Sequence, residues 1–225
     1  MAKSIILSER PRHACNIANK LKKLDIRRSA PENWVKYLRG ETETKPEPIE
    51  VYIYVSKERT PGERLLQIEE SDYHCKLERD CDNEDLECSC DILNQQIIAK
   101  FTLTEVEAIN LPYTEFKTGK WVRGEAFRTL QTKTMDEPEI LRKACLYEDE
   151  IYRYLNFNKK PCGYAWHIEN VVVFDNAMKL SNFIKPGFSY LAKANKRNGE
   201  PFTNEELEIN ITKAPQSWGY CEYGL

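Results

Sequence analysis

The sequence lacks the long apolar run that marks a membrane-spanning protein. A transmembrane helix needs about 18 or more consecutive apolar residues, and no such run occurs in the 225 residues. The N-terminal stretch MAKSIILSERP holds only a short apolar run before Ser8 and Glu9, whereas the apolar core of a signal peptide is longer. We therefore expect a protein of the cytoplasm that makes no membrane contact.

The sequence also lacks the short motifs of several large enzyme classes. It contains no G-x-x-x-x-G-K-S/T loop, no G-x-G-x-x-G, no H-E-x-x-H and no G-x-S-x-G. These motifs position phosphates, a metal ion or a nucleophilic serine. Chemistry on nucleoside triphosphates, on dinucleotides or through a serine nucleophile therefore has no support in this chain.

An excess of charge of one sign is missing overall but present locally. The net charge is only −3, which excludes a protein that grips nucleic acid by bulk charge alone. Residues 10–39 nevertheless hold nine Lys and Arg against two acidic residues, and residues 58–91 hold twelve Asp and Glu against four basic ones. The basic stretch indicates either a site for an anionic ligand or a solvated helix face.

The remaining composition is that of an ordinary globular protein. Hydrophobic residues make up 41% of the chain and charged residues 31%, a balance typical of a folded domain. We expect a single domain over residues 1–225, with an acidic, cysteine-rich insertion at residues 57–95. A chain of this length can bury a substantial core without disulfide bonds.

Four of the eight cysteines gather in the acidic insertion. They follow His74 and are Cys75, Cys81, Cys88 and Cys90. Four thiolates can fill a tetrahedral zinc site, although the spacing H-C-x5-C-x6-C-x-C differs from the usual C-x2–4-C pairs. Zinc held by these four cysteines is one prediction, and reduced thiols or a redox-labile pair is the other.

Apolar patterning predicts more strands than helices. Runs rich in β-branched and aromatic residues predict strands at 4–8, 23–27, 50–56, 96–103, 164–174, 207–212 and 216–223. Pro11 predicts the start of a helix, and residues 139–155 predict another helix with an interruption near Cys145. We expect a loop at 32–48 and a turn at Asp175–Asn176. Many strands with few helices favour a closed or nearly closed β-barrel plugged by helices.

Five segments in this order resemble the ASCH-domain family of the PUA-like superfamily. They are LSERPRHACNIANKLKKLDIRRSAP, VYIYVS, IIAKFTLTEV, GYAWHIENVVVFD and ITKAPQSWGYCEY. The resemblance implies an α+β fold, mainly β: a PUA-like barrel with flanking helices, enlarged here by the insertion. Members of the family are proposed to bind RNA, some bacterial members hydrolyse the amide of N4-acetylcytidine, and ribonuclease activity is known in others. Many members of this type are encoded by phages, so the resemblance also raises a phage origin.

The opening segment resembles the G-x-K-x-x-E-x-R motif of that family. The resemblance puts the family lysine on Lys22, its acidic or threonine position on Asp25 and its arginine on Arg27. Lys20 stands where the family has glycine, a residue usually placed where the backbone needs a positive φ. The match with the amidohydrolase members is weaker, because they have threonine at the position of Asp25.

Lys22, Asp25 and Arg27 are the main candidate ligand-binding residues. A lysine and an arginine at one cleft can hold a phosphate, and the carboxylate beside them can accept a hydrogen bond from a base amine. In a hydrolase, Lys22 would be the catalytic base or nucleophile and Asp25 would orient it. The alternative is an exposed ion cluster, worth well under about 1 kcal/mol.

Trp166 and Ser217 are further candidate ligand-binding residues. An exposed Trp166 ring can stack on a base, worth roughly 1–3 kcal/mol, and core packing is the alternative. The Ser217 hydroxyl can bind a ligand or a backbone group, and Trp218 is expected in the core. His167 is expected to be structural, with a ligand role left open.

Three functions from different classes stay open at this point. The first is binding of RNA or a modified nucleotide in a cleft around Lys22, Asp25 and Arg27. The second is hydrolysis of nucleosides or RNA, so the sequence does not decide whether the protein is an enzyme. The third is a phage protein that binds a host partner through the acidic insertion, whose charge would mimic nucleic acid.

Overall fold

The computed structural model describes residues 3–57, 95–110, 114–117, 120–123, 130–155 and 163–223. The chain divides into two compact units. Unit 1 comprises residues 1–20, 49–102 and 170–225, and unit 2 comprises residues 21–48 and 103–169. Two long strands, β4 (Gln96–Ile109) and β7 (Gly163–Lys179), contribute to both units.

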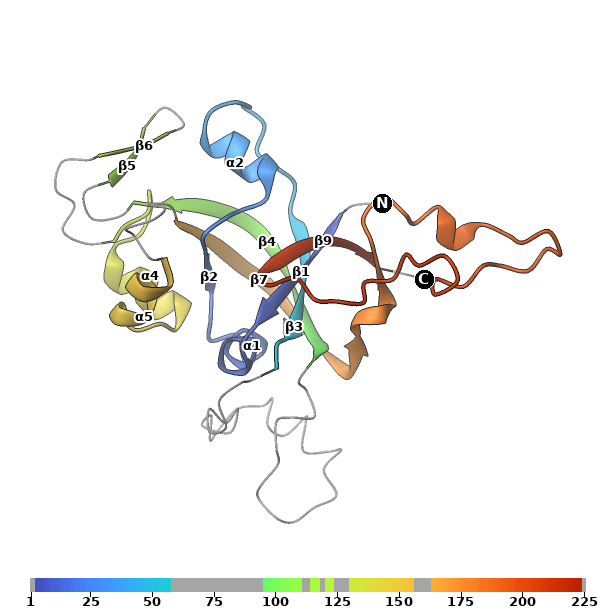
Figure 1. Cartoon of the computed structure of the whole chain (residues 1–225). Helices are drawn as coiled ribbons and strands as arrows, with labels where there is room; N and C mark the ends of the chain where they lie inside the picture. Colours follow the sequence, from blue (N-terminus) through green and yellow to red (C-terminus); the bar gives the residue numbers. More distant parts are fainter. Residues whose placement is uncertain are drawn as a thin grey trace, which may run out of the picture. The chain divides into compact units, whose positions relative to one another are not determined.

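Unit 1 is built around its first strand. β1 (Ser4–Glu9) lies between β3 (Ile49–Val55), to which it runs parallel, and β9 (Trp218–Tyr223), to which it runs antiparallel (Figure 1). The short β8 (Phe183–Ile184) pairs with β9. One core cluster of this unit consists of Ile6, Tyr52, Tyr54, Ile97, Phe183 and Cys221.

The helix of unit 1 begins as its sequence predicts. α1 (Pro11–Ala18) has proline in its first turn, where the missing N–H would have had no helical partner. Its apolar face is buried through residues such as Ala14 and Ile17. Two 3₁₀ turns, Leu180–Asn182 and Leu191–Lys193, complete the helical structure described in this unit.

Unit 2 packs two short helices against strands. β2 (Leu24–Arg27) pairs antiparallel with β7, and α2 (Glu32–Leu38) follows β2 in the chain. The strands β5 (Thr114–Lys117) and β6 (Lys120–Arg123) form a separate hairpin. The helices of the second half of this unit are α4 (Glu137–Ala144) and α5 (Glu148–Leu155). Together with β2, β4 and β7 they enclose the core of the unit. The core residues are Leu24, Ile26, Ile109, Leu130, Met135, Ile140, Ala144, Ile151, Leu155 and Ala165.

The predicted interruption near Cys145 is confirmed. Asp136 caps the start of α4 by accepting a hydrogen bond from the backbone N–H of Glu139 at 3.0 Å. Cys145 ends the helix in the left-handed region with φ 52°, the conformation that terminates many helices. The chain can therefore turn and start α5 so that both helices bury their apolar faces in one core.

The strands are assembled in a seven-stranded sheet in the order β2-β7-β4-β3-β1-β9-β8. A mixed α+β fold made mostly of strands is therefore confirmed. The closed barrel is a correction: among the described residues the sheet ends at β2 and β8 and does not close. β2 has four residues and β8 has two, which leaves little backbone for a closing ladder.

Three local predictions also need correction. Residues 32–48 contain α2, which places the Trp34 ring in the interior, fully buried. The predicted turn at Asp175–Asn176 is instead a continuous part of β7. The predicted strand at 207–212 does not form, because Glu208 takes a left-handed φ of 53° and Asn210 makes an isolated bridge to Ile184.

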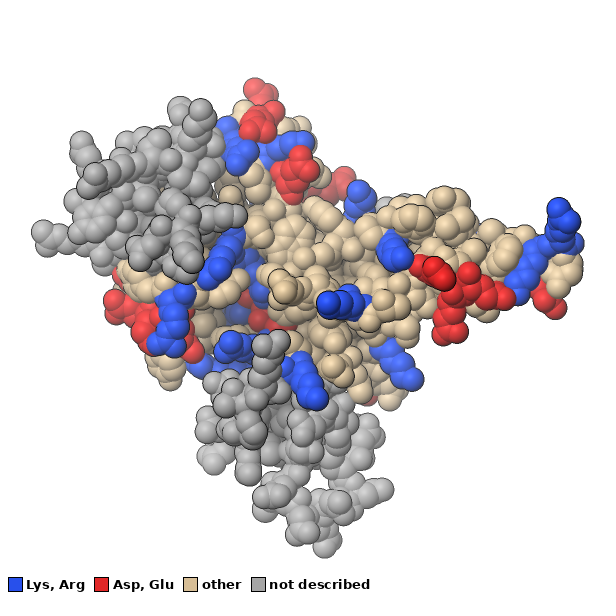
Figure 2. All heavy atoms as spheres, viewed as in Figure 1, with Lys and Arg blue, Asp and Glu red and all other residues tan. Residues whose placement is uncertain are grey.

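One long segment of unit 1, residues 185–208, does not form a continuous positively charged surface. Residues 185–208 extend away from β8 and β9 of the same unit (Figure 1), and both positive and negative side chains lie along them (Figure 2). Lys196 and Glu206 form an ion pair there at 2.7 Å. Alternating charge of this kind does not provide the continuous positive surface that follows a nucleic-acid backbone.

The described residues do not test two further predictions, the insertion and the single-domain organisation. Residues 58–94 of the predicted insertion are outside the described residues, so the single-domain organisation and the insertion both stay predictions. No helix among the described residues is long and apolar enough to cross a membrane.

Lys20 takes the backbone conformation that the missing glycine would have supplied. Its φ is +61°, and its backbone N–H donates to the carbonyl of Ile17 at 2.9 Å. A non-glycine residue with this φ is strained by the contact of Cβ with its own backbone. The tight turn is therefore kept although the glycine is absent.

Replacing Lys20 tests this strain. Lys20→Gly should raise the free energy of unfolding by about 0.5–1 kcal/mol, because glycine reaches positive φ without the steric cost. Urea denaturation measures the change. Lys23→Gly is the matched control: Lys23 is also exposed and donates its backbone N–H to the carbonyl of Lys143 at 2.7 Å. There glycine should lower stability by freeing the unfolded chain, and a loss in both variants would contradict the account.

Candidate functional site

The three residues of the opening motif come together in unit 2. Leu24 and Ile26 point into the unit 2 core, so Asp25 and Arg27 face the opposite side of β2. Lys22 stands three residues before Asp25, in the turn that leads into the strand, and reaches the same side chain.

Asp25 joins the two cations. The Lys22 Nζ donates to one carboxylate oxygen, Oδ1, at 2.5 Å, and the Arg27 Nε donates to the other, Oδ2, at 2.5 Å. Their relative exposures are 3% for Lys22, 1% for Asp25 and 6% for Arg27. The alternative of an exposed ion cluster is therefore wrong, and we call these three residues the buried trio.

Burial makes the close pairing of these charges important for the free energy of folding. Moving an ion from water into the protein interior costs roughly several kcal/mol, even after the protein relaxes around it. Only close, well-directed pairing offsets that cost. Asp25 supplies the pairing for Lys22 with one oxygen and for Arg27 with the other. The carboxylate therefore fixes the position of both cationic groups.

Trp166 shares a sheet face with the buried trio. In the β2–β7 register Asp25 is paired with Trp166 and Arg27 with Tyr164, and paired residues on adjacent strands project to the same face. Trp166 itself is 0% exposed. Its ring is thus a direct neighbour of the predicted site but is covered in this state, and its role in ligand binding stays a prediction.

Ser217 lies in unit 1 and holds the chain before β9. Its carbonyl accepts a hydrogen bond from the backbone N–H of Ser8 at 2.8 Å, and the Ser8 hydroxyl donates to the carbonyl of Pro215 at 2.6 Å. These contacts tie this segment to β1. Trp218, expected in the core, is half-buried and meets Tyr220 edge-on.

The predicted metal ligands cannot be placed. Cys75, Cys81, Cys88 and Cys90 lie outside the described residues, so a zinc site there stays a prediction. Within the described part of the chain, no group of three or more His, Cys, Asp and Glu side chains is arranged to hold a metal ion.

Part of the basic N-terminal stretch is neutralised locally. Besides the buried trio, Lys36 pairs with Glu32 at 2.8 Å, and Arg39 pairs with Glu41 at 3.6 Å. Local pairing of this kind lowers the positive field that a distant anion would feel.

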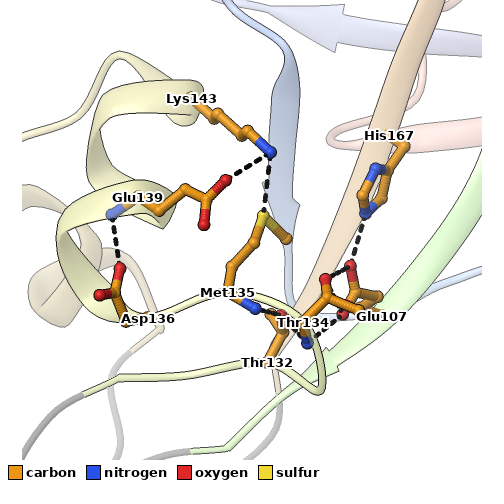
Figure 3. A network of polar contacts seen from close by, with 8 residues as sticks. All are labelled: Glu107, Thr132, Thr134, Met135, Asp136, Glu139, Lys143 and His167. Atoms are coloured by element: carbon orange, nitrogen blue, oxygen red, sulfur yellow. Dashed lines mark hydrogen bonds and ion pairs between the residues drawn. The ribbon is translucent and has the colours of Figure 1, made fainter.

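A second polar network in unit 2 involves a residue that the sequence did not single out. Glu107 on β4 contacts His167 on β7, with 2.8 Å between Oε1 and Nε2 (Figure 3). The Thr134 hydroxyl donates to the same carboxylate at 2.8 Å, and the Thr134 backbone N–H donates at 3.2 Å. The Thr132 hydroxyl accepts from the backbone N–H of Met135 at 3.0 Å and so fixes this loop.

These contacts decide the charge of Glu107. Burial acts to raise its pKa, but hydrogen bonds to His167, Thr134 and Thr132 outweigh burial and lower the pKa from 4.5 to about 2. The carboxylate is therefore ionised at neutral pH and can only accept hydrogen bonds. The contact at 2.8 Å therefore has Nε2 of His167 as the donor and the carboxylate as the acceptor.

His167 and the buried trio lie on opposite faces of the β2–β7 pair. His167 is paired with Leu24, a residue of the unit 2 core, whereas Trp166 is paired with Asp25. Strand parity did not single out Glu107, because Glu105 has the same parity and is exposed, whereas Glu107 is buried. A buried charged residue needs buried partners.

Comparisons with known proteins yield distant structural likenesses. No protein-family model matches the chain, and no curated protein matches its sequence. It is similar to the crystal structure of ASCH from Zymomonas mobilis, with 12% identity and a TM-score of 0.43 over 97% of this chain and 87% of that chain. A single-residue mutant of that protein gives 13% identity and 0.42 over 97% and 87%.

A further likeness is to the N-terminal domain of McrB from Staphylothermus marinus. The identity is 9% and the TM-score 0.32, over 92% of each chain. The name ASCH in the description of the Zymomonas structures is also that of the family whose motifs this sequence resembles. Likeness at this level carries no ligand, activity or site over to this chain, and it does not bear on a phage origin.

The lowered pKa of Glu107 predicts a specific pH dependence of stability. A carboxylate with a depressed folded-state pKa stabilises the fold above its ordinary pKa of 4.5, and that contribution is lost as the pH falls to about 2. The contribution is on the order of 3 kcal/mol. Glu107→Gln should therefore be less stable than wild type at neutral pH, with a difference that shrinks in acid.

Urea denaturation of both proteins from neutral pH down to about pH 2.5 measures this difference. Glu105→Gln on the same strand is the matched control, because Glu105 is exposed and pairs with Lys45 at a long 3.7 Å. A difference between wild type and Glu107→Gln that stays constant across the acid range would contradict the assignment.

Proposed function

We propose that this chain binds RNA or a modified nucleotide through the face of unit 2 that carries the buried trio. The observation that supports the proposal is the sharing of one buried carboxylate by a lysine and an arginine. Burying these charges costs solvation free energy that a surface ion pair would not lose. We take this cost as support for a binding role. The order of the motifs that resemble the ASCH family agrees with the proposal.

The trio suits an anionic group. Because Asp25 holds both Lys22 and Arg27 by direct hydrogen bonds, the two cationic groups lie close together and are oriented before a ligand arrives. Such preorganisation reduces the free energy lost on binding. An arginine fork can hold two oxygens of a phosphate at once, while lysine acts as a point charge.

Asp25 and Trp166 give this face a capacity to recognise a base. A carboxylate beside the phosphate-binding cations can accept a hydrogen bond from an exocyclic amine. The paired Trp166 lies on the same face and would stack on a base once a ligand displaces the groups that cover it. We expect modified nucleotides with an amine or amide at the base edge to be the best ligands.

A hydrolase is the second candidate, with Lys22 and Asp25 as the catalytic residues. In this structure the Lys22 Nζ donates a hydrogen bond to the Asp25 carboxylate at 2.5 Å, so its nitrogen is engaged with Asp25. This supports binding over lysine-based catalysis. Turnover of N4-acetylcytidine or RNA that disappears in Lys22→Met would favour the hydrolase instead. Binding of a host protein through the acidic insertion stays a prediction, since residues 58–94 lie outside the described residues.

Substituting Lys22 tests the proposed binding site. Fluorescence anisotropy with short RNAs and modified nucleotides should show that Lys22→Met binds about 10- to 100-fold more weakly, the loss expected for one charge-assisted hydrogen bond. The slope of log affinity against log salt should also fall by about one unit, because one phosphate contact is lost. A change in folding alone would not move that slope.

Lys23→Met is the matched control, because Lys23 is exposed and next in the chain. It should keep nearly wild-type affinity. Equal affinity of wild type and Lys22→Met, with both proteins folded, would refute the proposed site.

A further inference from the structure

The closing segment ITKAPQSWGYCEY contains a buried carboxylate that takes no part in the trio. Glu222 lies on β9 and is 5% exposed. Its Oε1 accepts a hydrogen bond from the backbone N–H of Gly187 at 2.7 Å, and its Oε2 accepts one from the backbone N–H of Ser189 at 3.0 Å. The two donors stand 35 and 33 residues earlier in the chain. One side chain of β9 therefore holds the backbone of a remote turn with both of its oxygens.

These hydrogen bonds keep the carboxylate of Glu222 charged. The N–H of Gly187 is the main reason why the pKa of Glu222 lies below 4.5. Burial acts to raise this pKa, while Ser189 and the amino terminus of the chain lower it further. The neighbouring Cys221 thiol stays neutral, because burial raises its pKa to about 12, with Glu222 and Glu50 adding to the shift. Glu222 is therefore ionised at neutral pH.

The turn held by this carboxylate lies at the base of a long protruding segment. Residues 185–208, which we call the arm, extend away from β8 and β9 (Figure 1). Within the arm the backbone N–H of Phe202 donates to the carbonyl of Ala194 at 3.1 Å, so the arm pairs with itself. At its base the backbone N–H of Lys185 donates to the carbonyl of Ile209 at 2.8 Å. A segment that pairs with itself and is fixed at its base can open as a unit, without the sheet.

We propose that Glu222 is an acid-sensitive latch, which holds the arm closed while its carboxylate is ionised and releases the arm on protonation. A proton added to one oxygen turns that oxygen into a donor, so the N–H that it held loses its acceptor. An unpaired buried N–H is costly, and the arm avoids this cost by opening into water.

The sign of the pH dependence follows from the lowered pKa. The latch contributes fully above pH 4.5, the ordinary value for the carboxyl group, and its contribution is lost as the pH falls from there through the lowered pKa. Glu222 and the arm both belong to unit 1, so the inference does not rest on the function proposed for the trio.

Amide hydrogen exchange of the full chain tests the latch. Protection factors, which correct for the intrinsic exchange rate, are measured from neutral pH down to about pH 3. The amides of Gly187 and Ser189 should lose about 10- to 100-fold of their protection in acid, the loss expected for one hydrogen bond to a charged group. Glu222→Gln has an amide nitrogen in place of one oxygen, so it should show this low protection already at neutral pH.

Glu205→Gln is the matched control, because it removes the same charge from an exposed position of the arm. It should keep the wild-type profile. Tyr220 and Cys221 on β9 pair with β1, and their amides should stay protected throughout. Their protection distinguishes release of the arm from unfolding of the sheet.

Three results would overturn the inference. They are equal protection of the arm in wild type and Glu222→Gln at neutral pH, a wild-type profile that does not change in acid, and a simultaneous loss of protection in the arm and β9. The wild-type acid profile compares the arm with β9 in one protein, so it decides the matter even if Glu222→Gln fails to fold.

Discussion

The hydrogen bonds from Lys22 and Arg27 to the carboxylate of Asp25 place three charged side chains in the interior of unit 2, and the surrounding structure must accommodate them. Buried charges need close, well-directed partners, and a marginally stable fold depends on keeping them. The constraint also sets strand register. With Asp25 facing one side, Leu24 and Ile26 must enter the core on the other, because a shift by one residue would exchange the two faces.

The need to pair a buried charge also explains the contacts around Glu107. Glu107 is a second buried carboxylate, and it too is satisfied by several donors, from His167 and Thr134. The two carboxylates differ in their partners. Asp25 pairs with a lysine and an arginine, whereas Glu107 contacts a histidine ring nitrogen and a threonine hydroxyl.

The sequence predicts the regular parts of this fold because local patterns determine them. The β-branched runs at β1 and β3, the Pro11 helix start and the break at Cys145 all follow from side-chain shape and backbone preference. α2 was missed because its seven residues are too few to display a helical period around the single buried Trp34.

The candidate site was predictable in part. The motif indicated Lys22, Asp25 and Arg27, but their burial depends on packing that one strand does not reveal. Glu107 was missed because its partners, His167 and Thr134, are distant in the chain.

The central claim is that Asp25 presents Lys22 and Arg27 as one site for a phosphate. A crystal structure of the protein with its best-binding short RNA or modified nucleotide tests this most directly. The account predicts a phosphate oxygen within hydrogen-bond distance of both Lys22 Nζ and the Arg27 guanidinium, with Asp25 still bonded to at least one of them. A ligand bound elsewhere, with the trio unchanged and still covered, would contradict it.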